Sequence, residues 1–266
     1  MSLTEGERWT REALGQLAGG RYSPAAIVDF LAASRHRADD VARERPDAAR
    51  QAGRWFVVGL VPWAIVGRRR GRRAAAAGVW WWTACGAMVY WHLGMLETPD
   101  GRPRRLSGAD ALTLTRAWLV PLAWERPTGT ICVVGGLTDA LDGVVARRGE
   151  PTRAGRDLEG LVDACFGVAT LRGSARHDLV APVAIRAELV RLGLGAAYST
   201  ASYFGALSPP ERSVVGAGRA LSPLRVAGVA LGVTGHRTSA SILLGAGAAA
   251  AVLDAAVAAG ATARPG

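Results

Sequence analysis

Lysine is absent from this 266-residue chain, so its 32 basic residues are all arginine. Acidic residues are in the minority at 22, which gives a formal net charge of +10. We attribute the exclusive use of arginine to a GC-rich bacterial genome, and it carries no information about chemistry.

Cysteine is almost as scarce. Cys85, Cys132 and Cys165 all lie in apolar segments, and none of them has the C-x-x-C spacing of a metal or redox motif. This pattern supports neither a zinc site nor a disulfide framework. The first twenty residues contain three glutamates and no apolar run, so we expect no cleavable signal peptide.

Charge is missing from long stretches of the chain. Half of the residues are hydrophobic and 20% are charged, with the charge gathered in residues 1–52 and in short clusters. Segments 74–96 and 238–260 are nearly free of it. This distribution argues against disorder and against a plain nucleic-acid-binding domain. We expect an all-α, polytopic membrane protein, whose spans need about 20 mainly apolar residues each.

Three parts follow from this patterning. Residues 1–52 are helix-prone and mixed in charge, and Ser23 before Pro24 is typical of a helix N-cap. We expect a short cytosolic helical extension there. Residues 53–105 should add one or two membrane segments, and residues 106–260 should form a six-helix core.

The additional segments are 55–67, which is short and contains Pro62, and 74–96, which carries a set of aromatic residues typical of membrane interfaces. The arginine run Arg68–Arg73 lies between them and suits anionic lipid headgroups better than nucleic acid. The sequence leaves open which of these two segments crosses the membrane.

The predicted core helices are joined by short connections. The arginines in the connection at 147–156 indicate that it faces the cytoplasm. The six expected helices cover residues 108–125, 128–147, 155–172, 179–205, 213–234 and 238–259.

Acidic residues are costly inside such helices, and here four of them fall close together. Asp139 and Asp142 are three residues apart, and Glu159 and Asp163 are four apart, so each pair shares a helix face. Two antiparallel helices would bring the four carboxylates together near the cytoplasmic surface. Oxygen-only ligands favour Mg²⁺ or Mn²⁺, and we expect two ions.

Small residues and one arginine accompany the acids. Gly143, Ala146 and Gly155 leave room for a bulky ligand to approach the backbone. Arg147 ends the first of the two helices and is a fixed cation able to hold a phosphate. The cluster therefore indicates a phosphate or diphosphate substrate.

The order of these residues resembles a known family. Asp139-Ala-Leu-Asp142-Gly143-Val-Val-Ala146-Arg147, followed by Gly155-x3-Glu159-x3-Asp163, is similar to the signature D-x2-D-G-x2-A-R-x8-G-x3-D-x3-D of the class I CDP-alcohol phosphatidyltransferases. The segment 112–116 also resembles the first-helix segment of that family. The resemblance covers 108–259. The loop before Gly155 is one residue shorter than in the family, and Glu159 stands where the family has aspartate.

The resemblance implies transfer of a phosphatidyl group from a CDP-linked lipid, CDP-diacylglycerol, to an alcohol acceptor with release of CMP. It implies metal binding by Asp139, Asp142, Glu159 and Asp163, with Asp163 also acting as the general base. Nucleotide binding would fall to Gly143, Ala146, Arg147 and Gly155. It further implies a homodimer in the bacterial plasma membrane, with the site facing the cytoplasm.

The residues that would bind the alcohol acceptor are harder to identify from the sequence. Arg219, Arg225 and Arg116 could bind a phosphorylated alcohol, or they could reach toward anionic lipid headgroups. In the fourth core helix, Glu188 and Arg191 have the spacing of a helical ion pair.

Two other functions stay open. A membrane prenyltransferase also binds a diphosphate through acidic residues and Mg²⁺, but its acidic motifs should be far apart in sequence, whereas all four acids here fall within 139–163. A catalytically weak membrane scaffold is favoured by Glu159 and by the shortened loop.

Overall fold

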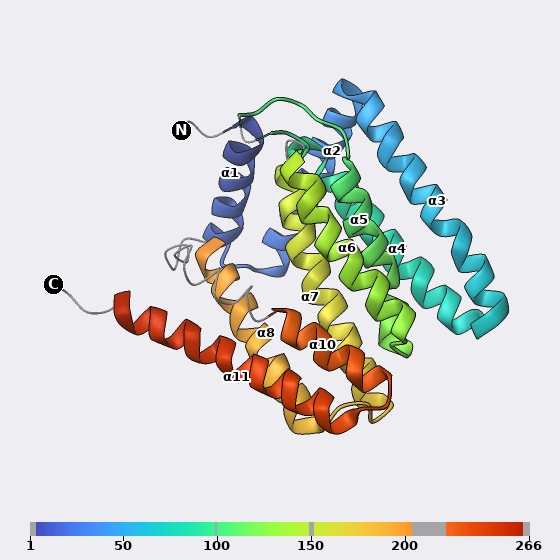
Figure 1. Cartoon of the computed structure of the whole chain (residues 1–266). Coiled ribbons are helices and arrows are strands. Elements are labelled where there is room, and N and C mark those ends of the chain that lie inside the picture. Colours follow the sequence, from blue (N-terminus) through green and yellow to red (C-terminus); the bar gives the residue numbers. More distant parts are fainter. Residues whose placement is uncertain (1–3, 99, 149–151, 204–221, 263–266) are drawn as a thin grey trace. The chain divides into compact units, whose positions relative to one another are not determined.

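The computed structural model describes residues 4–98, 100–148, 152–203 and 222–262, and for 146–148, 202–203, 222–223 and 254–262 it describes the backbone alone. Helices form nearly all of these residues, and no β-strand occurs among them (Figure 1). The prediction of an all-α protein is therefore confirmed. Among the described residues, no helix combines the length with the apolar composition that crossing a membrane requires.

The chain forms two compact units. Unit 1 comprises Met1–Pro121 and Leu137–Asp163, and unit 2 comprises Leu122–Gly136 and Ala164–Gly266. The four carboxylates of the sequence motif all belong to unit 1.

Unit 1 begins with two helices that are capped by local sequence signals. Helix α1 spans Glu5–Gly19, and Thr4 and Glu7 cap it reciprocally, each side chain bonding the backbone of the other. Helix α2 spans Pro24–Glu44, and the Ser23 hydroxyl accepts a 3.3 Å hydrogen bond from the Ala26 backbone. The predicted helical structure of this region and the N-cap at Ser23 are confirmed.

An antiparallel hairpin follows. Helix α3 spans Pro46–Arg70 and helix α4 spans Arg72–Trp91, with a single residue, Gly71, between them (Figure 1). Gly71 has a φ of 92°, a conformation that favours glycine. Helix α3 runs through Pro62 without ending.

Glycines let the two hairpin helices approach closely. A Cβ atom at Gly59 would lie 2.2 Å from the Trp82 ring, and one at Gly78 would lie 2.1 Å from the Trp63 ring. Aromatic rings thus fill the space that side chains at these glycines would need. Dense packing of this kind is sensitive to single methyl groups.

Tryptophan side chains also join the hairpin to the next helix, α5 (Gly108–Glu125). Trp81 donates a 2.8 Å hydrogen bond to the Ala117 carbonyl, and Trp118 donates a 3.0 Å bond to the Gly59 carbonyl. The rings of Trp63 and Trp118 lie 4.6 Å apart. Burying an indole while satisfying its N–H gains both packing and hydrogen bonding.

The connection from α4 to α5 contains the short 3₁₀ helix η1 (Leu93–Met95) and a bridge between Glu97 and Pro103. Helices α6 (Gly129–Arg148) and α7 (Arg153–Arg176) follow α5. The apolar core of this unit includes Leu93, Leu96 and Leu106, all nearly inaccessible to solvent.

Unit 2 contains α8 (Pro182–Tyr203), α10 (Ser222–Val233) and α11 (Arg237–Thr262), with α11 packed against both of the others. Its core is made by buried aliphatic side chains from α7, α8, α11 and the segment before α8: Leu171, Val180, Ala184, Ile185, Ala240 and Leu244. The helix bounds lie within a few residues of the six expected core helices, except that 213–221 is outside the described residues.

Candidate active site

Two helices of unit 1 present the predicted carboxylates. Asp139 and Asp142 lie on α6, and Glu159 and Asp163 lie on α7. The Asp142 side chain is 4% exposed, whereas those of Asp139 and Asp163 are 51% and 41% exposed. The cluster therefore has a buried floor at Asp142 and an accessible rim.

Arg116 of α5 lies at the centre of this cluster. Its Nη2 atom is 2.6 Å from Asp163 Oδ1, 2.9 Å from Asp142 Oδ2 and 3.7 Å from Asp139 Oδ1. Only 2% of the residue is exposed. A buried charge is tolerated where it is paired and hydrogen-bonded, and the carboxylates of two other helices supply those partners.

The remaining donors of Arg116 are the most informative feature of the site. Its Nε and Nη1 atoms are buried and have no hydrogen-bond partner among the described residues. Asp163 Oδ1 is also buried, and it is paired with Arg116 Nη2 at 2.6 Å. Buried polar atoms without partners are rare in folded proteins and call for an explanation such as a ligand.

Thr113 completes the floor. Its hydroxyl lies 3.3 Å from Asp142 Oδ2, one helical turn before Arg116, so both side chains of α5 face the same carboxylate. The sequence analysis did not single out Thr113. Its spacing of three from Arg116 was the available signal.

The two glycines of the motif differ in what the structure shows. Gly155 lies in the first turn of α7, where an added Cβ would be 2.4 Å from Asp110 Oδ1 and 2.9 Å from Thr152 Oγ1. Only a residue without a side chain fits there. Gly143 follows Asp142 on α6 and is partly exposed.

Asp110 is a buried carboxylate that the sequence analysis missed. Its Oδ2 atom accepts hydrogen bonds from the backbone and the hydroxyl of Ser107, at 2.6 and 2.8 Å. The Ser-x-x-Asp spacing before an apolar helix was the signal that could have identified it as a capping residue.

The other predicted binding residues are not gathered at this cluster. Ala146 and Arg147 lie in the last turn of α6, and their side chains are outside the described part of the chain. Arg219 is also outside the described residues. Arg225 belongs to unit 2, where its Nε atom lies 3.4 Å from Glu188. Of the three predicted acceptor-binding arginines, only Arg116 is described beside the carboxylates.

The predicted pairing within α8 is confirmed. Arg191 contacts both carboxylate oxygens of Glu188 at 2.7 Å. Glu188 is nearly buried and thereby holds two arginines, Arg191 and Arg225.

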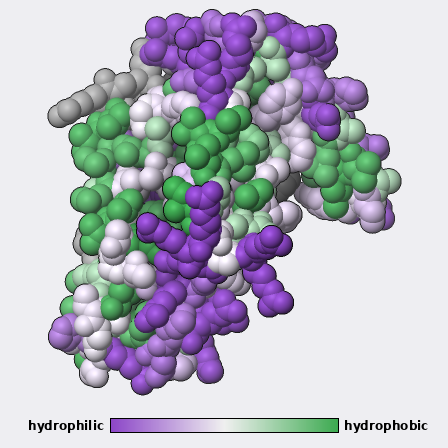
Figure 2. All heavy atoms as spheres, turned by 90° about the vertical axis from the view of Figure 1, so that its right-hand side faces the viewer, coloured by the Kyte–Doolittle hydropathy of each residue, from purple (hydrophilic) through white to green (hydrophobic). Residues whose placement is uncertain are grey.

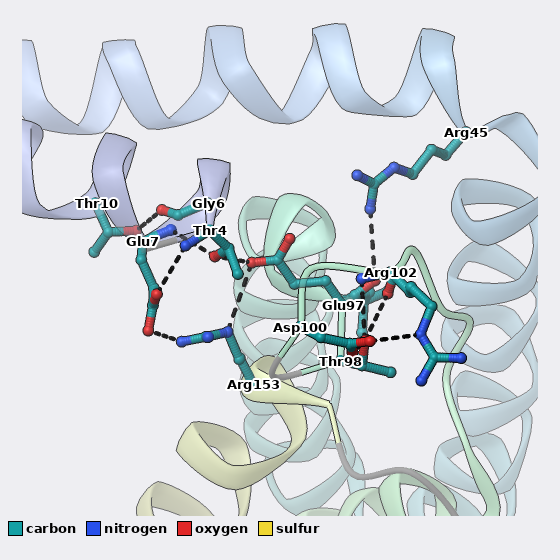
Figure 3. A network of polar contacts seen from close by, with 11 residues as sticks. Thr4, Gly6, Glu7, Thr10, Arg45, Glu97, Thr98, Asp100, Arg102 and Arg153 are labelled. Atoms are coloured by element: carbon teal, nitrogen blue, oxygen red, sulfur yellow. Dashed lines mark hydrogen bonds and ion pairs between the residues drawn. The ribbon is translucent and has the colours of Figure 1, made fainter. Parts of the chain in front are cut away.

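A polar network holds the start of α7 (Figure 3). Arg153, the first residue of α7, forms an ion pair with Glu7 of α1, and its Nε atom lies 3.7 Å from the buried Glu97 carboxylate. Glu97 also accepts a hydrogen bond from the Thr4 hydroxyl. The N-terminal extension is therefore tied to the helix that carries Glu159 and Asp163.

Metal-ligating geometry is not preformed. Within the described ranges, no three or more acidic, histidine or cysteine side chains are grouped around one point as metal ligands. Three of the carboxylates instead converge on Arg116. The donor set nevertheless consists of oxygens alone, and four carboxylates against one guanidinium leave a formal excess of three negative charges. That excess is what a divalent cation would compensate.

Comparison with known proteins gives no assignment: no protein-family model, no curated protein and no solved structure matches this chain.

Proposed function

We propose that the protein is a membrane-embedded CDP-alcohol phosphatidyltransferase. It transfers the phosphatidyl group of a CDP-linked lipid, CDP-diacylglycerol, to an alcohol acceptor and releases CMP. The observation that carries the proposal is the convergence of Asp139, Asp142 and Asp163 on the buried Arg116, which still has two N–H donors without partners.

The donor chemistry of the motif residues suits two Mg²⁺ or Mn²⁺ ions, although their side chains are not grouped as metal ligands within the described ranges. The motif carboxylates offer only oxygen ligands; they belong to Asp139, Asp142, Glu159 and Asp163. Together they carry more negative charge than the single positive charge of Arg116 neutralises. When bound, the ions would neutralise the diphosphate and stabilise the phosphate of the departing nucleotide.

Arg116 suits the diphosphate of the donor. Its Nη2 atom pairs with the carboxylates, and its buried Nε and Nη1 atoms are two further donors that a phosphate group reaching them would satisfy. A guanidinium matches phosphate through paired hydrogen bonds, which a lysine cannot reproduce. Arg147 would add a second cation, and Gly143, Ala146 and Gly155 would leave room for the nucleotide.

Asp163 is our proposed general base. The acceptor hydroxyl oxygen attacks the phosphorus of the phosphatidyl group, and the bond from that phosphorus to the bridging diphosphate oxygen breaks. CMP leaves with that oxygen, and the hydroxyl proton passes to Asp163. The side chain is 41% exposed, so an acceptor can approach the carboxylate, while its buried Oδ1 atom stays paired with Arg116.

A membrane location is part of the proposal. Apolar side chains are exposed along α3, α6 and α8, among them Val58, Leu137 and Val183. Arginines gather at the α3–α4 turn, where anionic lipid headgroups would neutralise them. We place the protein in the bacterial plasma membrane, with the carboxylates on the cytoplasmic side and two copies forming a homodimer.

Release of CMP from labelled CDP-diacylglycerol tests the function. The full chain in detergent, with Mg²⁺ or Mn²⁺ and a panel of free and phosphorylated alcohols, should release CMP with at least one acceptor. Asp163→Asn should lower the rate by about 10²–10⁴-fold, the usual contribution of a general base. Asp157→Asn, which alters an exposed acid of the same helix, is the matched control and should keep the activity. An absence of CMP release with every acceptor would contradict the proposal.

A further inference from the structure

Unit 1 also contains a cavity whose lining includes none of the motif carboxylates. This cavity of about 480 Å³ lies among α2, α3, α4 and the start of the α5 region. This volume is within the range of ligand pockets in proteins. Aromatic side chains form much of its wall: Trp55, Phe56, Trp82 and Trp91.

Small residues on α3 keep this cavity open. A Cβ atom at Gly53 would meet no atom within 4 Å, whereas one at Gly59, less than two turns further along α3, would meet the Trp82 ring. Gly53 therefore has open space beside it in the wall of the cavity, whereas Gly59 is packed against Trp82.

Polar side chains of α2 and α4 adjoin the cavity. Arg35 of α2 lines it, and the Arg35 side chain is 75% exposed. Its Nε atom lies 3.9 Å from Asp39, whose other carboxylate oxygen accepts a hydrogen bond from the Tyr90 hydroxyl. Tyr90 lines the cavity too. A guanidinium, the carboxylate paired with it and a phenol hydroxyl thus adjoin a wall of aromatic and aliphatic side chains.

The surface around the cavity has the same amphiphilic character. Val57, Val58 and Val61 of α3 are all more than half exposed. Figure 2, which looks onto the side of the molecule that carries α3 and α4, shows apolar patches next to hydrophilic groups. An exposed apolar face beside a cavity whose mouth contains an arginine fits a lipid better than it fits a soluble metabolite.

We infer that this cavity binds an anionic phospholipid, with an acyl chain against the aromatic wall and the phosphate at Arg35. The chain burial supplies affinity, and the guanidinium selects the negative headgroup. The site does not depend on the carboxylate chemistry, so it stands or falls independently of the proposed function.

Native mass spectrometry of the full chain tests this inference. The probes are dioleoyl phosphatidic acid and dioleoyl phosphatidylcholine, added separately at equal concentration. Wild-type protein should retain one phosphatidic acid molecule and bind phosphatidylcholine about three- to fivefold more weakly, as expected for loss of one exposed ionic contact.

Two variants and a control locate the lipid. Gly53→Leu places a bulky side chain in the cavity wall, at a position where an added Cβ atom meets no other atom, and should weaken phosphatidic acid binding at least about tenfold. Gly15→Leu, on α1, also adds a side chain to an open helical position and should bind like wild type. Arg35→Gln should abolish the preference for phosphatidic acid while phosphatidylcholine binding persists. Unchanged binding by Gly53→Leu, or an unchanged preference in Arg35→Gln, would overturn the inference.

Discussion

Two sets of helix contacts in unit 1 are built from opposite chemistry. Between α3 and α4, rings of Trp63 and Trp82 fill the space above glycines, and the contact is almost wholly apolar. Among α5, α6 and α7, a single buried arginine is shared by three carboxylates. Apolar packing stabilises a fold directly, whereas a buried ionic cluster contributes little net stability and is retained for another reason. The contrast indicates that the packing of α3 on α4 at these glycines serves the fold and that the carboxylate cluster serves a ligand.

Arg116→Met should give the largest effect. It leaves the buried carboxylates without their cation, at a cost of about 3–5 kcal/mol in the free energy of unfolding. Because a divalent ion can take over the charge, Mn²⁺ should restore much of this loss. Thermal unfolding in the presence of a chelator measures the loss of stability, and thermal unfolding with Mn²⁺ measures its restoration. A variant as stable as wild type in the chelator would show that the cluster does not need the arginine.

Trp63→Ala should destabilise to a similar or slightly smaller extent, by about 3–5 kcal/mol, because it removes a side chain that is 1% exposed. Here Mn²⁺ should restore nothing. Trp80→Ala is the matched control on the same hairpin, since Trp80 is 73% exposed and should cost little. Equal losses in the two variants would refute the packing that we describe.

Alanine substitutions distinguish a tightly packed glycine of α3 from a glycine that has open space beside it. Gly59→Ala should destabilise by about 1–3 kcal/mol, because its Cβ meets the Trp82 ring. Gly53→Ala should instead stabilise by about 0.5–1 kcal/mol, as alanine does in an unobstructed helix. Chemical denaturation of both variants measures the change in the free energy of unfolding. A change of the same sign in both variants would contradict the tight packing at Gly59.

Asp100→Asn should have the smallest effect. This exposed carboxylate precedes α5 in the polar network, and a hydrogen bond from the Thr98 hydroxyl, together with the Arg102 guanidinium, lowers its pKa. A carboxylate whose pKa is lowered by folding stabilises the folded state at pH values above 3.8, its pKa in the unfolded chain. This stabilisation is lost as the pH falls through the lower pKa of the folded state. The small stability difference between wild type and variant should thus be present near pH 7 and shrink as the pH falls below 3.8. A difference that persists in acid would exclude this cause.

The sequence predicted the local features well. Ser23 and Pro24 begin α2 as expected, because capping depends on a few neighbouring residues. The apolar periodicity predicted α5 at its observed bounds. Pro62 did not end α3, although proline removes a helical hydrogen bond. The buried Trp63 that follows it packs on Trp118, and such tertiary contacts offset the local cost.

The contacts that join distant residues were not predictable in the same way. The spacing of Asp139, Asp142 and Asp163 identified the acids, yet nothing in the spacing placed Arg116 between them. The ion pair from Glu7 to Arg153 links residues far apart in the chain, and it depends on how α1 packs. Periodicity reports which face of a helix is buried but not which partner it meets.

Binding of CDP tests the central claim most directly, because it requires no knowledge of the acceptor. With Mn²⁺ present and CDP at about 100 times its Kd, the wild-type protein should be stabilised by about 2.7 kcal/mol against unfolding. The stabilisation should vanish with a chelator and in Asp142→Asn, and it should persist in Asp157→Asn. Stabilisation by CDP that needs no metal, or that survives in Asp142→Asn, would contradict the assignment of the carboxylates to a metal–diphosphate site.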